Sequence, residues 1–456
     1  MMQEHLPAPQ YGLTIAVEAR RMLSREQNEY ITRVGPGTPM GALMRQYWVP
    51  AMLSSELPRP DCPPVRVLLL GEKLIGFRDT SGQVGLLGNH CPHRGASLYY
   101  ARSGECGLRC VYHGWKFDVT GRCVDMPSEP PDSNFKNKVR ATAYPCAERG
   151  GVVWAYLGPR EVPPPLPDLE ANQLENSSAV AYARDCNWLQ GLEGDIDTAH
   201  IGFLHFGSED PADAPPDTFR YWTLKDRAPR YAVLDTDYGA MYGAYRPAGA
   251  AQQYWRIAQF LFPFFTMPPT GLLGRQIIAR AWVPMDDEHM MMFFMRPEPG
   301  AEQLAFIRQH VKPPKLLPNT TDWLGRFRLD ANESNDYHLD RDRQERHEEY
   351  SGIEGIHTQD QAITESMGPI YDRSAEHLGS SDAMVIRARR RLIASARALA
   401  EHGAVPPGVD NPDAYRQRSG GVVLDDDADW VAATENLRRA YVTHPELDPA
   451  VVGGFV

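Results

Sequence analysis

The stretch that decides the fold is Cys91-Pro92-His93 followed, with sixteen residues between, by Cys110-Val111-Tyr112-His113. Each half offers one thiolate and one imidazole close together, and each leads into a glycine, at Gly95 and at Gly114. Glycine permits a tight turn in which backbone N–H groups point at a bound group. We therefore interpret the two halves as two loops that hold one metal centre.

The order of the ligands distinguishes two kinds of metal centre. Zinc fingers usually group their two cysteines together and their two histidines together, whereas here the types alternate. Two thiolates on one iron and two imidazoles on the other is the ligation of a Rieske [2Fe–2S] cluster. We expect Trp115, which follows the second loop, to shield the cluster from water. The predicted cluster ligands are Cys91, His93, Cys110 and His113.

Short apolar runs surround these loops and predict a compact antiparallel β domain over residues 47–160. Examples are 65–70, 74–77 and 152–157, separated by Gly, Pro and Asp. The proline-rich segment 158–167 cannot continue a strand or a helix, and we place a domain boundary there.

The segments before and after this domain have different patterns. Residues 1–46 are predicted to be an N-terminal extension and a helical segment, in which Ser24 and Gln27 have the spacing of a capping box. Residues 161–456 form the second domain, with a helix over 187–206, several strands over 220–300 and a helix over 381–401. The arginine run of that last helix is expected to form a solvated face, and the tail from 403 is expected to pack against the body.

A second group of metal-binding side chains lies between residues 187 and 206. On a regular helix Glu193, Asp197 and His200 share a narrow arc, but His205 lies about 140° from His200. Both histidines can bind one metal only if the helix widens or ends between them, and Gly202 permits a π-type bulge. Two histidines and a carboxylate are the ligands of non-haem Fe(II) oxygenases. Asp197 is placed to hydrogen-bond a ring N–H of a metal-binding histidine.

The carboxylate ligand of this iron must come from farther along the chain. Spacing alone does not choose among the candidates, which are Asp330, Asp336, Asp340, Asp342, Glu345, Glu354, Asp360, Glu365 and Asp372.

Composition restricts the partners and the location. The chain has 456 residues and a net charge of −12, which argues against nucleic acid and anionic lipid as partners. No run reaches the roughly 18 apolar residues that span a bilayer, and the N-terminus lacks a secretory signal, so we expect a cytoplasmic protein. Seven cysteines cannot all pair, and a reduced state is expected for the five outside the cluster. Two of these, Cys106 and Cys123, are expected to be buried.

Both groups of ligands, in this order, resemble the oxygenase (α) component of the Rieske non-haem iron aromatic-ring-hydroxylating oxygenases. The resemblance covers nearly all of the chain from Met22 and is strongest to the phthalate dioxygenase-like subgroup. The segments that carry the subgroup resemblance are 22–29, 33–41, 227–230 and 358–369. It implies an α+β fold, in which the antiparallel β Rieske domain precedes a helix-covered antiparallel sheet of the helix-grip type.

The resemblance also implies roles for individual residues. The family's third iron ligand follows a glutamine, which points to Asp360 after Gln359. Asp197 matches the aspartate that links the Rieske histidine of one subunit to an iron-binding histidine of the next. That geometry implies a homotrimer or a hexamer of stacked trimers.

The expected reaction is the dihydroxylation of a phthalate- or benzoate-type aromatic carboxylate by O₂, with electrons from a separate flavin and iron–sulfur reductase that uses NAD(P)H. Arginine pairs carboxylates bidentately, so candidate substrate-binding residues are Arg227, Arg230, Arg246 and Arg256. One alternative is an O-demethylase of a methoxylated aromatic acid with the same metals. An alternative of a different class is a non-catalytic Rieske electron carrier, which the length of the chain disfavours.

Overall fold

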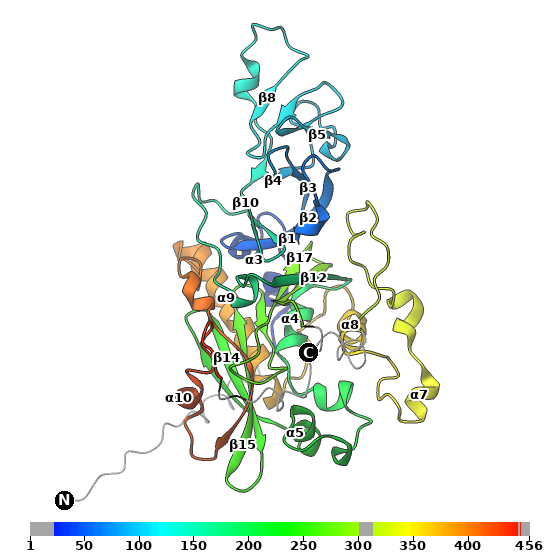
Figure 1. The fold of residues 1–456 in the computed structure, drawn as a ribbon, viewed down its shortest axis with the longest axis vertical. Coiled ribbons are helices and arrows are strands. Elements are labelled where there is room, and N and C mark those ends of the chain that lie inside the picture. Colours follow the sequence, from blue (N-terminus) through cyan, green and yellow to red (C-terminus); the bar gives the residue numbers. More distant parts are fainter. Residues whose placement is uncertain (1–21, 301–312, 446, 448–456) are drawn as a thin grey trace, which may run out of the picture.

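The chain forms two parts that stack along the long axis of the molecule (Figure 1). The computed structural model describes residues 22–300, 313–445 and 447. A β-rich part, coloured blue to cyan, lies at one end, and a larger part of sheet and helices lies below it (Figure 1). The predicted extension over residues 1–21 lies outside the described residues. Within the described ranges, no helix is long and apolar enough to cross a bilayer.

The β-rich part contains three small sheets, and all their strand pairs are antiparallel, as predicted. The first sheet has the order β1 (Trp48–Leu53), β11 (Val152–Tyr156) and β10 (Cys146–Arg149). The second has the order β2 (Val65–Leu69), β3 (Glu72–Arg78), β4 (Val84–Gly88) and β9 (Ala143–Tyr144). The third, which carries the second Cys-His loop, has the order β5 (Arg102–Gly104), β6 (Gly107–Arg109), β7 (Lys116–Phe117) and β8 (Cys123–Asp125).

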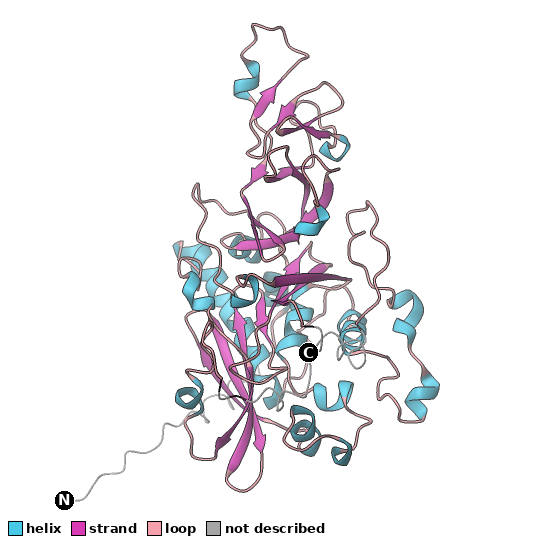
Figure 2. Ribbon diagram, in the orientation of Figure 1, coloured by secondary structure: helices cyan, strands magenta, loops and turns pink. Residues whose placement is uncertain are grey.

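The larger part is built on one antiparallel sheet, again as predicted (Figure 2). Its strand order is β12 (Ser177–Arg184), β18 (Met290–Pro297), β17 (Ala279–Pro284), β16 (Phe265–Met267), β15 (Gln252–Leu261), β14 (Gly239–Pro247) and β13 (Arg230–Asp235). The tail adds β19 (Gly420–Asp425), which pairs with β15, so the described part of the tail packs against the body as expected. The proline-rich segment 158–167 has neither strand nor helix.

Helices pack on this sheet and on one another. They are α2 (Arg25–Thr32), α3 (Pro39–Met44), α4 (Trp188–Ile196), α5 (Phe219–Lys225), α7 (Arg341–Glu345), α8 (Ile356–Ser366), α9 (Ala383–His402) and α10 (Trp430–Thr434). Short 3₁₀ segments cover 54–56, 98–100, 135–138, 170–172, 211–213, 380–382 and 412–415, and two 3₁₀ turns meet at a kink within 333–338. Ser24 and Gln27 make the predicted capping box at the start of α2.

Helix α4 lies close against the sheet at Gly191. A Cβ atom at this position would come within 2.3 Å of the Met290 side chain and 2.5 Å of the Trp282 ring. Only glycine therefore lets the helix approach β17 and β18 so closely. This approach places the end of α4, and the metal-binding residues that follow it, over the sheet.

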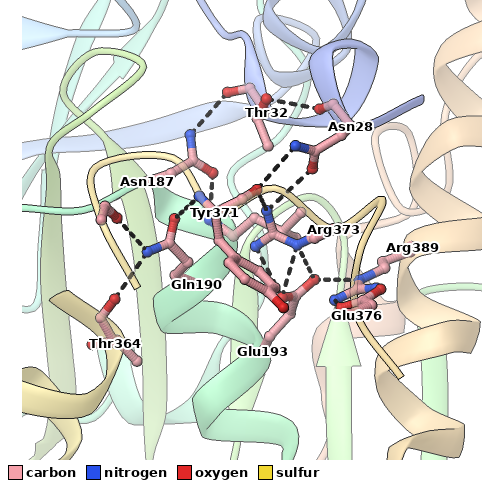
Figure 3. Close-up of polar contacts among 12 residues, drawn as sticks. Asn28, Thr32, Asn187, Gln190, Glu193, Thr364, Tyr371, Arg373, Glu376 and Arg389 are labelled. Carbon is pink, nitrogen blue, oxygen red and sulfur yellow. Dashed lines mark hydrogen bonds and ion pairs between the residues drawn. The ribbon is translucent and has the colours of Figure 1, made fainter. Parts of the chain in front are cut away.

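A buried ionic network holds α4 from the other side (Figure 3). The Glu193 carboxylate of α4 accepts hydrogen bonds from Arg373, with Nη2–Oε2 at 2.9 Å, and from Arg389 of α9, with Nε–Oε1 at 2.5 Å. Arg389 also pairs with Glu376, and Arg373 donates to Asn28 of α2. Two cations and two carboxylates thus balance in a buried cluster that joins α2, α4 and α9.

This network corrects one prediction. The arginine run of α9 is not entirely a solvated face, because Arg389 is buried and its charge is balanced by two carboxylates. Arg387 of the same run has an exposed side chain that pairs with Asp235, as expected of a solvated face. Glu193, which shares a helical arc with Asp197 and His200, binds the two arginines with its carboxylate.

We expect Arg373→Met to destabilise the larger part of the molecule. Removing one partner from a buried ion-pair network leaves a carboxylate without its counter-charge, which costs about 3–5 kcal/mol. The matched control, Arg387→Met, breaks an exposed pair worth less than about 1 kcal/mol. Midpoints of urea denaturation measure the difference, and equal shifts for the two variants would contradict the role of the network.

Candidate iron sites

The two Cys-His loops have the same backbone. The N–H of Cys91 donates to the carbonyl of Ala96 at 2.8 Å, and the N–H of Gly95 donates back to Cys91 at 2.9 Å. Cys110 repeats both bonds with Trp115 and Gly114, at 2.9 and 3.0 Å. Both glycines have positive φ, 74° at Gly95 and 78° at Gly114, which other residues adopt only at a cost.

In both loops the cysteine side chain is buried and the histidine ring is partly exposed. Cys91 and Cys110 are each 3% exposed, whereas the His93 and His113 rings lie toward the rim with centroids 4.4 Å apart. Trp115 is buried and stacks on His93 at 4.2 Å, in the covering position that the sequence predicts. Burial raises the pKa of the Cys91 thiol to about 11, so iron must displace its proton on binding. Two inner thiols and two outer imidazoles fit a Rieske cluster.

The other cysteines are free, as expected, but one lies elsewhere than predicted. Cys123 is buried, whereas the prediction that Cys106 is buried is wrong. Glu105 and Cys106 form the two-residue tip of the β5–β6 hairpin, and both have positive φ. Such a tip points into solvent, so Cys106 is exposed.

The second site begins where α4 ends. The helix stops at Ile196 rather than continuing to 206, and Asp197 is extended, with φ −86° and ψ 123°. A π-helical turn over Ile201–His205 then follows, with Gly202 buried inside it. The wider turn brings the two Nε2 atoms of His200 and His205 to 3.2 Å, which a regular helix would not do. The predicted bulge at Gly202 is present, whereas the break at Ile196 lies before His200 and was not predicted.

Asp360 of α8 completes this group. Its Oδ1 lies 3.2 Å from His205 Nε2 and 3.6 Å from His200 Nε2, and the three ligand atoms lie within 4.8 Å of one another. Among the carboxylates that spacing left open, Asp360 is the one that the described structure brings to both histidines. Burial opposes ionisation of Asp360, but the two imidazoles outweigh it and hold its pKa well below the usual range. Two imidazoles and one ionised carboxylate fit a non-haem Fe(II) ion.

Each histidine is oriented by a partner at its other ring nitrogen. His200 Nδ1 lies 3.3 Å from the Asp197 carboxylate, and His205 Nδ1 lies 2.7 Å from Gln359 Oε1. The Gln359 amide nitrogen donates to Glu349 Oε1 at 2.7 Å and to the carbonyl of Ile353 at 2.8 Å. The amide oxygen must therefore accept, so His205 carries its proton on Nδ1 and turns a free Nε2 toward Asp360.

The carboxylate and the amide affect the two rings differently. Burial disfavours the charged imidazole, but Asp197 outweighs it and raises the pKa of His200. The orienting role of Gln359 was not predicted, because the sequence shows its adjacency to Asp360 but not its contact with Glu349.

A cavity opens beside these three ligands. Its wall combines an apolar lining with Arg256, Arg280 and His357, and with the carboxylates of Asp195 and Asp197. The apolar side chains are Ile201, Phe206, Phe219, Pro268, Pro269 and Ile356. Apolar walls around a few polar groups are typical of small-molecule sites.

Arg256 is the one of the four predicted substrate-binding arginines that lines this cavity. It is 1% exposed, lies 4.1 Å over the Phe219 ring, and donates to Thr198 and to the carbonyl of Pro269. No described carboxylate lies within ion-pair distance of it, and burial lowers its pKa. A buried cation without a counter-ion costs free energy that an anionic ligand would offset.

The other three predicted arginines lie away from the cavity wall. Arg246 is buried on the face of the sheet that carries Arg256 and donates to Thr223. Arg230 of β13 pairs with Tyr245 of β14. Tyr245 is adjacent to Arg246 and therefore points to the opposite face, so Arg230 lies on that face too, where it is exposed. Arg227 donates to the carbonyls of residues 206 and 209. The structure therefore brings none of these three into contact with the cavity.

Comparison with known proteins decides the family. Residues 47–145 match the Rieske [2Fe-2S] domain, and residues 155–448 match a domain described as LigXa C-terminal domain like. The chain belongs to the Rieske non-haem iron oxygenases. It is thus an oxygenase (α) component that uses a Rieske [2Fe–2S] cluster and a mononuclear iron, and the alternative of a non-catalytic electron carrier is wrong.

Similar members of this Rieske oxygenase family support the assignment. The chain is 47% identical to the 3-chlorobenzoate-3,4-dioxygenase oxygenase subunit of Comamonas testosteroni, over 91% of this chain and 98% of that one. It is 38% identical to the phthalate 4,5-dioxygenase oxygenase subunit of Pseudomonas putida, over 90% and 94%. The 5,5'-dehydrodivanillate O-demethylase oxygenase subunit of Sphingobium sp. (strain NBRC 103272 / SYK-6) is 34% identical, over 82% and 80%.

The fold is also similar to that of a solved structure. Dicamba monooxygenase superposes with a TM-score of 0.55 at 17% identity, over 79% of this chain and 100% of that chain. At this identity the similarity concerns the fold alone.

We expect Gln359→Leu to weaken metal binding at the mononuclear site about 10- to 100-fold, because His205 loses the acceptor that sets its tautomer. Titration of the protein depleted of mononuclear iron with Co(II) measures the dissociation constant. Gln361→Leu is the matched control, since Gln361 is buried in the same helix but bonds Ala331 and Glu365 instead. Equal affinities for the two variants would refute the orienting role.

Proposed function

We propose that this terminal oxygenase uses O₂ and electrons from a separate NAD(P)H-dependent reductase to dihydroxylate an aromatic carboxylate of the phthalate or benzoate type. The observation that carries the proposal is Arg256, a buried cation without a described counter-ion on the wall of the cavity beside the iron ligands. The substrates named for the Comamonas and Pseudomonas relatives, 3-chlorobenzoate and phthalate, are aromatic acids and support it.

The proposal assigns a role to each residue. The cluster is assigned to Cys91, His93, Cys110 and His113 in a domain over 47–160, and the mononuclear iron to His200, His205 and Asp360 in a domain over 161–456. When bound, the mononuclear iron activates O₂ with electrons from the cluster. Arg256 pairs with the substrate carboxylate and holds the ring beside the iron ligands. The apolar wall takes up the ring and excludes water.

We also propose that the enzyme works as a homotrimer, or as two stacked trimers. The cluster loops lie in the upper part of one chain, far from α4 in the lower part (Figure 1), which favours electron transfer between copies. Val111 and Tyr112, beside His113, are 59% and 54% exposed. Ile363 and Met367, also exposed, line a cavity that contains Asp197. Docking of the first surface on the second would bury apolar side chains and bring His113 toward Asp197.

O-demethylation of a methoxylated aromatic acid is a second candidate reaction, because the Sphingobium relative is an O-demethylase subunit and the same metals serve both reactions. A cytoplasmic location fits the seven free cysteines and the need for NAD(P)H.

We expect Arg256→Met to raise KM for aromatic acids about 10- to 100-fold, because the variant loses charge-assisted hydrogen bonds to the carboxylate. The assay uses the whole enzyme, a surrogate reductase and a panel of benzoates, phthalates, phenoxybenzoates and methoxybenzoates. The variant removes an unpaired buried charge, so its fold is expected to persist. Arg230→Met, on the other face of the sheet, is the control and is expected to match the wild type. An unchanged KM in Arg256→Met would refute carboxylate binding by this residue.

We expect Asp197→Asn to keep both metals and to slow electron transfer between them. The amide retains the shape of the carboxylate but has no charge and only one acceptor oxygen, so it does not both fix His200 and accept a hydrogen bond from a docked histidine. Stopped-flow measurement of cluster oxidation in a single turnover with substrate and O₂ reports the rate. Iron content and the visible spectrum of the cluster serve as controls. A wild-type rate of cluster oxidation with both metals present would refute a role of Asp197 in electron transfer.

A further inference from the structure

His357 is a polar side chain of the cavity that the iron site does not use. It lies in the first turn of α8, three residues before Asp360, so the two side chains project about 60° apart on one helix face. Asp360 reaches the two iron-binding histidines, and His357 lines the cavity next to them. His357 is not a member of the metal-binding group itself.

Both ring nitrogens of His357 are available to a ligand. Among the described residues neither makes a hydrogen bond, and the ring contact is with Tyr182, whose centroid lies 5.7 Å away. Burial lowers the pKa of His357 to about 3, so the ring is neutral. A neutral imidazole has one N–H donor and one nitrogen acceptor. His357 is half-buried and its nitrogens are not among the enclosed atoms that lack a partner, so they face the cavity, where a ligand can hydrogen-bond them.

The positions of His357 and Arg256 give the cavity two different ends. His357 contacts Tyr182 of β12, whereas Arg256 belongs to β15, and β18, β17 and β16 lie between these strands in the sheet. The other arginine of the wall, Arg280 of β17, forms an ion pair with Asp195. Among the described residues of the wall, Arg256 is therefore the cation without an ion pair, whereas Arg280, whose charge acts on His357, is balanced by Asp195.

We propose that His357 is a specificity-determining residue that hydrogen-bonds a neutral oxygen substituent, a hydroxyl or a methoxyl, on the ring of an aromatic monocarboxylate. The inference rests on the proposed function, in which Arg256 holds the single carboxylate. A second carboxylate at the other end would lose its water and meet a neutral ring instead of a cation. Dicarboxylates such as phthalate are thus poorer substrates than hydroxy- or methoxybenzoates.

The test compares matched substrates in matched variants. Hydroxybenzoates and methylbenzoates substituted at position 3 or 4 have similar shapes but differ in hydrogen bonding. The enzymes are the wild type, His357→Phe, which keeps a ring without polar atoms, and His357→Gln, which keeps a donor and an acceptor. The readouts are kcat/KM with a surrogate reductase, iron content, and the ratio of product to O₂ consumed.

We expect the wild type to prefer the hydroxybenzoate of at least one pair about 10-fold over its methyl analogue. His357→Phe abolishes this preference by slowing the hydroxybenzoate alone, and His357→Gln retains part of it. Both variants keep their iron. If His357→Phe is insoluble, His357→Leu replaces it.

Three results would overturn the inference. They are the absence of a preference in the wild type, equal losses on both substrates in His357→Phe, and a preference for phthalate over every hydroxy- and methoxybenzoate. Different results would refute the proposed function itself. In that case the wild type converts no aromatic acid, or Arg256→Met leaves KM unchanged. If Arg256→Met raises KM for all acids while His357→Phe loses equal activity on both substrates of a pair, only the role of His357 is refuted.

Discussion

The approach of two imidazoles across one π-helical turn is the constraint on which the catalytic half of the structure depends. His200 and His205 lie five residues apart, and a regular helix would direct their rings about 140° from each other. The end of α4 at Ile196 and the wide turn over Ile201–His205 bring their Nε2 atoms to 3.2 Å. Such a turn is less stable than a continuous α-helix, so the residues around it must hold it in place.

The stabilisation comes from elements that are distant in sequence. Glu193, one turn before the break, is held by arginines about 180 and 196 positions later (Figure 3). Gln359 ties His205 to Glu349, and Asp197 orients His200. One imidazole thus has a charged partner and the other a neutral one. The ring beside the carboxylate is the more basic ligand, while the ring beside the amide is fixed mainly in tautomer and direction.

The sequence predicts the parts of this arrangement that are local. Alternating cysteine and histidine in two glycine-ended loops identify the cluster, and the misfit between His200, His205 and a regular helix identifies the bulge at Gly202. Long-range pairing is what the sequence does not reveal. Helical periodicity placed Glu193 with Asp197 and His200 but contained no information on Arg373 or Arg389. By residue type, all four arginines are equal candidates to bind a carboxylate. Only the strand register separates Arg256 on the cavity wall from Arg230 on the opposite face.

The proposed binding of an aromatic acid must be reconciled with the acidic composition of the protein. A net charge of −12 repels an approaching carboxylate, but surface charges are screened beyond about 8–10 Å at physiological salt. Inside the cavity water is displaced, and the attraction between unit charges grows several-fold over its value in bulk water. Of the carboxylates in the wall, Asp195 is balanced by Arg280 and Asp360 faces the two iron-binding histidines, so the charge of Arg256 acts on a carboxylate held beside it. Under the proposed function, the protein field slows the approach of the aromatic acid, while Arg256 determines how firmly and in which direction it is held.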